Sequence, residues 1–173
     1  MSTFSSRSIK IGTPFPSDDP TRVYRDFLYS SGSPDMNVDG SVTPIIFSID
    51  ALPNNYLHLY EIRTIFVDRF IGFGENKFGE LAALTNGVKY SIYYDSIETT
   101  LGNLRTNEDF LFLGPGPGAI LDSTGLYDMV SVIQRFDQPI ELRKGSSDAF
   151  RITIRDNLTG ANYFRALAYG VRE

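Results

Sequence analysis

Two segments near the C-terminus constrain the fold most strongly, because their apolar side chains recur at every second position. In residues 149–156 the apolar positions are Phe150, Ile152 and Ile154. Arginine and threonine fill the positions between them, which is typical of a β-strand with one buried face and one solvated face. A second strand-like segment covers residues 161–171, and the linking sequence is Asn157-Leu158-Thr159-Gly160. The pattern therefore predicts an antiparallel hairpin.

Other runs of strand length follow one another along the chain. They cover residues 42–49, 57–67, 81–85, 88–94, 109–113, 128–136 and 139–143. The run at 57–67 has apolar residues on both parities, which predicts a central strand covered on both faces. Asn86-Gly87 is the strongest short signal for a tight hairpin turn, because a type I′ turn needs positive φ at both central positions.

No stretch after residue 40 has a sustained 3.6-residue apolar period, so helical bundles and α/β folds fit poorly. The sequence predicts an all-β body, residues 41–173, built as an antiparallel two-sheet sandwich that is jelly-roll-like. A closed barrel is the alternative that pattern alone leaves open.

The first 40 residues differ in composition, with clustered Ser, Pro, Asp and Gly, and are predicted to form an extended N-terminal arm. Within it, residues 20–29 are compatible with one short amphipathic helix or with an extended strand. Ordering such an arm costs backbone entropy, so its apolar anchors need a surface on which to bury. We expect four side chains to contact a neighbouring chain: Phe15, Val23, Tyr24 and Phe27.

The composition limits which partners the protein can bind and in which compartment it assembles. A net charge of −5 disfavours nucleic acid, and the apolar runs are far too short to span a membrane. The chain has no cysteine, and its start lacks the apolar core of a secretory signal, so we expect assembly in a cytoplasm. Arginine outnumbers lysine and tyrosine is abundant, a combination typical of protein interfaces.

The sequence contains few of the residues that usually build catalytic and metal sites. His58 is the only histidine, and it lies inside a strand-like run, where we expect it to be packed or hydrogen-bonded. Asp35, Asn37 and Asp39 match the first half of a calcium loop, but its twelfth position is Ile46 instead of a glutamate. The sequence therefore predicts no metal site, no cofactor and no enzymatic activity.

Glu61 lies two positions from Arg63 within one strand-like run, so the two side chains share a face. This spacing predicts a charge pair that is solvated or lies in an interface.

Several stretches resemble small virion proteins of tailed bacteriophages, of the capsid decoration (cement) type. They are Asp39-Gly40-Ser41-Val42-Thr43-Pro44-Ile45-Ile46-Phe47, Ala83-Leu84-Thr85-Asn86-Gly87-Val88 and Asp156-Asn157-Leu158-Thr159-Gly160, followed by Phe164-Arg165-Ala166 and Tyr169-Gly170. The resemblance implies a jelly-roll-like body, a homotrimer on the capsid exterior, and an arm that reaches over neighbouring subunits of the major capsid protein. It implies no catalytic residues.

The expected function is therefore that of a structural virion protein that binds and stabilises the outside of a phage capsid. The alternative is a carbohydrate- or receptor-binding sandwich of a phage tail or fibre, in which exposed tyrosines such as Tyr93 stack on sugar rings.

Overall fold

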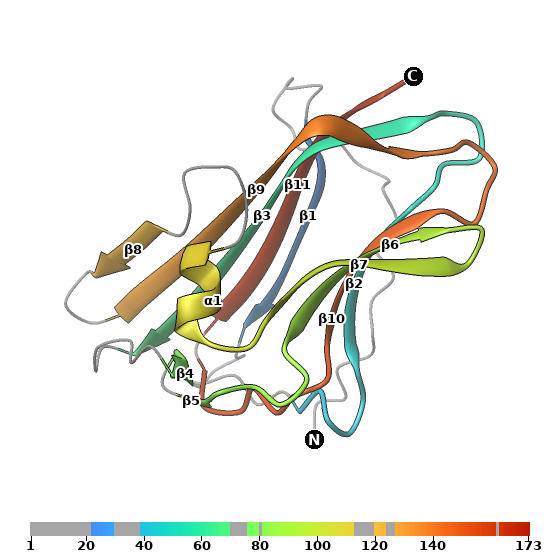
Figure 1. Ribbon diagram of the computed structural model, residues 1–173. Helices are drawn as coiled ribbons and strands as arrows, with labels where there is room; N and C mark the ends of the chain where they lie inside the picture. Colours follow the sequence, from blue (N-terminus) through green and yellow to red (C-terminus); the bar gives the residue numbers. More distant parts are fainter. Residues whose placement is uncertain are drawn as a thin grey trace.

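The computed structural model is almost entirely antiparallel β-structure, arranged as two sheets that face each other (Figure 1). It describes residues 22–29, 39–69, 76–79, 81–112, 120–123, 127–161 and 163–173. The five-stranded sheet contains, in spatial order, β1 (Arg22–Tyr29), β11 (Tyr163–Arg172), β3 (Leu57–Arg69), β9 (Tyr127–Leu142) and β8 (Ile120–Ser123). The four-stranded sheet contains β2 (Ile45–Asp50), β10 (Ala149–Ile154), β6 (Val88–Tyr94) and β7 (Ile97–Leu104). The prediction of an all-β sandwich is confirmed.

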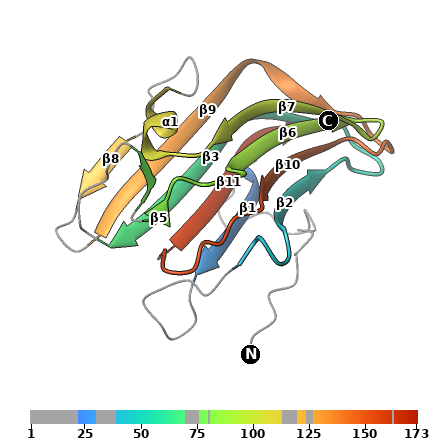
Figure 2. The same cartoon turned by 60° about the horizontal axis from the view of Figure 1, so that its bottom comes forward.

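Early strands pair with late ones. β1 pairs with β11, β2 with β10, β3 with β9 and β6 with β7, all antiparallel. Successive pairs alternate between the sheets, so a long two-stranded ribbon wraps over itself (Figure 2). This order is that of a jelly roll, and it favours the sandwich over the closed barrel. A small hairpin of β4 (Lys77–Phe78) and β5 (Leu81–Ala82) and the helix α1 (Asn107–Phe112) lie beside this ribbon.

The two C-terminal segments are strands, but the prediction that they form a hairpin with each other is wrong. β10 pairs with β2 and β6, whereas β11 pairs with β1 and β3 in the other sheet. The alternation itself is confirmed, because its apolar members are all buried: Phe150, Ile152 and Ile154. Alternation decides which face of a strand is buried, while the wrapping of the whole ribbon decides its neighbours.

The predicted hairpin at Asn86-Gly87 is also wrong. β5 pairs with β4, and the backbone N–H groups of Thr85, Asn86 and Gly87 all donate to the carboxylate of Asp156, at 2.8 to 3.1 Å. Gly87 has the expected positive φ, 81°. Here that geometry aims consecutive N–H groups at an anion instead of reversing a strand.

The actual tight turn joins β6 to β7 at Asp95-Ser96, where φ is 49° and 71°. Two successive positive φ values are those of a type I′ turn. The strand β7 that follows was not predicted from the sequence.

Residues 109–113 were predicted as a strand, but α1 covers most of them. Thr106 Oγ1 accepts a hydrogen bond from the N–H of Asp109, and Asp109 Oδ2 accepts one from the N–H of Thr106. This reciprocal capping box stabilises the first turn of a helix that is too short to produce a recognisable apolar period. The strands predicted at 128–136 and 139–143 are one continuous strand, β9.

The short helix considered for residues 20–29 is not formed over Arg22–Tyr29, which is the extended alternative, β1. Its backbone pairs with β11 of the same chain, from Arg22 opposite Tyr169 to Tyr29 opposite Tyr163. Pairing at this edge satisfies backbone groups of β11 that a helix would leave without partners.

The strand β3 is central as predicted, but it is not covered on both faces. Its register shifts against both neighbours between Leu59 and Glu61. Tyr60 is an extra, bulged residue against β11, whereas residues 136–139 of β9 are the extra ones on the other side. A bulge reverses the parity of everything after it. Leu57, Leu59, Ile62 and Phe66 therefore all reach the core, while Tyr60 is 46% exposed.

The core lies between the two sheets. The ring of Phe47 on β2 lies 5.5 Å from that of Phe164 on β11. The hydroxyls of Thr64 and Tyr90 form a hydrogen bond of 2.7 Å across the same interface. Burial raises the pKa of Tyr90, so it remains a neutral hydrogen-bonding group.

One buried carboxylate lies just before β10 and another just after it. Asp148 comes directly before the strand and accepts hydrogen bonds from the N–H groups of Asp95 and Arg143 and from the Arg143 guanidinium. Asp156 comes two residues after the strand and accepts those of residues 85–87. These two side chains tie the loops at opposite ends of the sandwich to one central strand.

We predict that Asp156→Ala lowers the free energy of unfolding by about 2–4 kcal/mol, because three backbone donors lose their acceptor. Chemical denaturation measures this. The matched control is Asp137→Ala, which removes an exposed carboxylate on β9 and should change stability by less than about 0.5 kcal/mol. Equal effects of the two substitutions would contradict the role given to Asp156.

Candidate functional site

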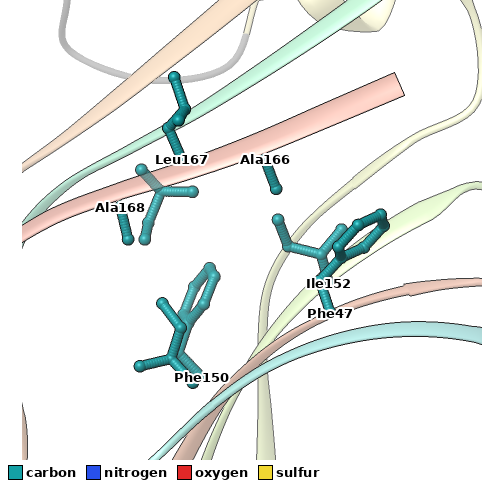
Figure 3. Close-up of a pocket in the computed structure, with 8 residues that line it drawn as sticks. Phe47, Phe150, Ile152, Ala166, Leu167 and Ala168 are labelled. Atoms are coloured by element: carbon teal, nitrogen blue, oxygen red, sulfur yellow. The ribbon is translucent and has the colours of Figure 1, made fainter. Parts of the chain in front are cut away.

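The space between the sheets is packed with apolar side chains. A cavity there has a volume of about 10 Å³ and is lined by Phe47, Ile49, Ile62, Phe150, Ile152, Ala166, Leu167 and Ala168 (Figure 3). Sites for small molecules usually occupy about 300–1,000 Å³, so this cavity is a packing defect and not a ligand site. The clusters of polar and aromatic side chains described below lie on the outer surface.

The outer face of the five-stranded sheet carries a cluster that we call the Arg–Tyr face. Its members are Tyr60, Glu61, Arg63, Arg135 and Tyr169. Glu61 is at the centre, where Oε1 accepts a hydrogen bond of 2.8 Å from Arg63 Nη2 and Oε2 accepts one of 2.9 Å from Arg135 Nε. The guanidinium of Arg63 lies 5.6 Å from the ring centroid of Tyr169.

Strand register and the β3 bulge bring these residues together. Glu61 is directly opposite Arg135 on β9 and Tyr169 on β11. The bulge turns Tyr60 and Glu61 away from the core together, so an aromatic ring and a carboxylate emerge side by side. The predicted pairing of Glu61 with Arg63 is confirmed. Arg135 and Tyr169 were missed, because only the register of strands far apart in sequence reveals them.

Half-buried apolar residues adjoin this cluster. Leu167 lies opposite Arg63 in the register, and Ile65 is the next outward-facing residue of β3. Arginine and tyrosine are enriched where protein interfaces hold most of their binding energy, and aliphatic side chains beside them add apolar contact area.

The outer face of the four-stranded sheet is more polar. Glu98 Oε1 lies 2.6 Å from Lys89 Nζ and accepts a hydrogen bond of the same length from Ser91. These contacts lower the pKa of Glu98 to about 2. The Arg151 guanidinium lies 4.4 Å from the ring centroid of Tyr93. Tyr93 is therefore already stacked on a side chain of its own sheet, which leaves less of its ring for a sugar.

A third surface is formed by the loops at one end of the sandwich. Asp148 is fully buried, and its contacts with Arg143 hold the pKa of its carboxyl well below the usual range. Arg143 also reaches Asp95 at 2.8 Å, and the N–H of Ala51 donates to Asp148 O. The three loops after β2, β6 and β9 are thereby joined. Ile97, the first residue of β7, follows the turn after β6 and has 72% of its surface exposed.

The arm residues expected to contact a partner are only partly within the described structure. Phe15 lies outside the described residues, and Val23, Tyr24 and Phe27 belong to β1. Tyr24 is in register with Ala168, and Phe27 with Arg165. Contact of these residues with a neighbouring chain remains a prediction.

Two of the three residues of the half calcium loop, Asp35 and Asn37, also lie outside the described residues. Asp39 Oδ1 accepts hydrogen bonds from the N–H and the hydroxyl of Ser41, and the hydroxyl contact is the main cause of its lowered pKa. Its carboxylate thus stabilises its own turn. Among the described residues no group of three or more His, Asp or Glu side chains could hold a metal ion.

His58 is a packed strand histidine, as predicted. Its ring stacks on that of Tyr56 at 6.5 Å between centroids, and its Nε2 lies 3.5 Å from Glu173 Oε2.

Comparisons with protein families, with curated proteins and with solved structures found no match to this chain. In the part of the chain that the structure describes, no helix has the length and apolarity that crossing a membrane requires.

We predict that Glu98 contributes to the acid sensitivity of the fold. Its pKa is about 2 in the folded state and 4.5 ordinarily, so its stabilising contacts are fully present above about pH 4.5 and are lost as the pH falls towards 2. Glu98→Gln should therefore flatten the dependence of unfolding free energy on pH between about 5 and 2. The effect should be modest and weaken with added salt, since the pair is partly solvated.

The control for this measurement is Asp137→Asn, which removes an exposed carboxylate from β9. Urea denaturation across the pH range should give the wild-type slope for this control. An unchanged slope in Glu98→Gln would show that the Lys89 and Ser91 contacts do not stabilise the folded state.

Proposed function

We propose that this protein is a structural virion protein that binds the outer surface of a phage capsid and stabilises it. The observation that carries the proposal is the Arg–Tyr face, an outward surface of the jelly-roll body in which arginine and tyrosine gather as they do in protein interfaces. The resemblance to capsid decoration proteins supplies the identity of the partner, the major capsid protein. The proposal includes a homotrimer on the capsid exterior and a contribution of the N-terminal arm to neighbouring subunits.

The mechanism is adhesion across joints between shell subunits. Copies arranged by the symmetry of the shell convert modest individual affinities into strong collective retention, because each added contact is effectively intramolecular. The net charge of −5 suits an outer surface better than one that faces packaged DNA.

The second candidate is a carbohydrate- or receptor-binding sandwich of a phage tail or fibre. The ring of Tyr93, on which a stacked sugar was expected, already carries the Arg151 guanidinium. Specific hits on a glycan array would favour this candidate over decoration.

We predict that the purified protein co-sediments with capsids from which it has been removed, and that its return raises the temperature at which the shells open. Capsids that already carry their full complement are the control and should bind no more. The copy number in intact virions should be in the hundreds. A copy number of a handful, or no binding to stripped capsids, would contradict the proposal.

A further inference from the structure

The charges of the Arg–Tyr face are not balanced. Glu61 is the one carboxylate among the described contacts of two guanidinium groups, and it receives a single N–H from each. The cluster therefore has a net charge of about +1 on a chain whose overall charge is −5.

Hydrogen-bond donors remain unused in this cluster. A guanidinium has five N–H donors and no acceptor. Arg63 Nε is buried and has no hydrogen-bond partner among the described residues. Arg135 donates a hydrogen bond from Nε to Glu61. Its two Nη groups have no hydrogen-bond partner among the described residues, and 55% of the side chain is exposed.

We propose that the Arg–Tyr face binds a carboxylate side chain of the partner protein. The oxygens of this carboxylate accept hydrogen bonds from the exposed Nη groups of Arg135, next to Arg63. The inference rests on the proposed function, since the partner is then a capsid subunit that presents an Asp or Glu. A planar guanidinium whose Nε is already fixed by Glu61 is preorganised for a charge-assisted, bidentate hydrogen bond.

A protein carboxylate suits this surface better than a phosphate polymer. Both guanidinium groups already donate hydrogen bonds to a carboxylate, that of Glu61, at 2.8 and 2.9 Å. Tyr60 within the cluster, and Ile65 and Leu167 beside it, suit the apolar surroundings of an acidic residue in a protein surface.

The first test compares binding of three variants to stripped capsids at about 50 and 300 mM NaCl. Arg135→Gln should raise Kd about tenfold at the lower salt concentration and reduce its dependence on salt, because a desolvated charge pair is lost. Arg135→Lys keeps the charge without the fork and should fall between the wild type and Arg135→Gln.

The matched control is Arg155→Gln, which removes the same charge from an exposed side chain beyond the end of β10 and should change Kd by less than about twofold. Denaturation curves establish that each variant is folded. Equal effects of Arg135→Gln and Arg155→Gln would overturn the inference and leave the proposed function intact, because capsid binding itself would persist.

The second test needs no capsid. Poly-L-glutamate should produce saturable shifts in the arginine side-chain NMR signals of Arg135, and inorganic phosphate at equal charge should not. Absence of a shift with poly-L-glutamate, or equal shifts with phosphate, overturns a carboxylate-selective site. If stripped capsids bind nothing while poly-L-glutamate still shifts Arg135, the proposed function fails and the carboxylate site stands.

Discussion

The structure depends on two buried carboxylates that hold the loops of a wrapped ribbon to its central strand. A jelly roll sends its chain from one sheet to the other at both ends, and each crossing leaves backbone N–H groups that no strand can pair. Asp148 and Asp156, on either side of β10, accept such groups from the loops after β6 and β5, which are distant in sequence. The sheets can then keep their apolar faces together without a disulfide or a metal among the described residues.

Side-chain alternation correctly predicted the class of fold and the buried face of most strands, because it reports a local property of the backbone. Alternation could not predict which strands pair. For that reason the predictions of hairpins at residues 157–160 and at Asn86-Gly87 were both wrong. Asn86-Gly87 also shows that one signal can serve two purposes, since positive φ at a glycine suits a tight turn and a nest for a carboxylate equally. The bulge at Tyr60 had no recognisable signal, yet it reverses the parity of β3.

The same limits apply to the candidate site. The pairing of Glu61 with Arg63 was visible because both residues lie within one strand. Arg135 lies 74 positions from Glu61, and only the register of β9 brings it there. The outer faces of the two sheets therefore differ, and composition alone could not show where each cluster lies. The four-stranded sheet carries an arginine–tyrosine stack beside a polar ion pair. The five-stranded sheet carries two arginines that share one carboxylate next to aliphatic residues.

The proposed function requires that the protein adhere through the Arg–Tyr face. Hydroxyl-radical footprinting of the free and capsid-bound protein tests it most directly, because it reports the exposure of individual side chains. Tyr60, 46% exposed in the free chain, should become protected on binding, whereas Val42, 79% exposed and outside this face, should remain reactive. Unchanged oxidation of Tyr60 in a complex that demonstrably forms would contradict adhesion through this face.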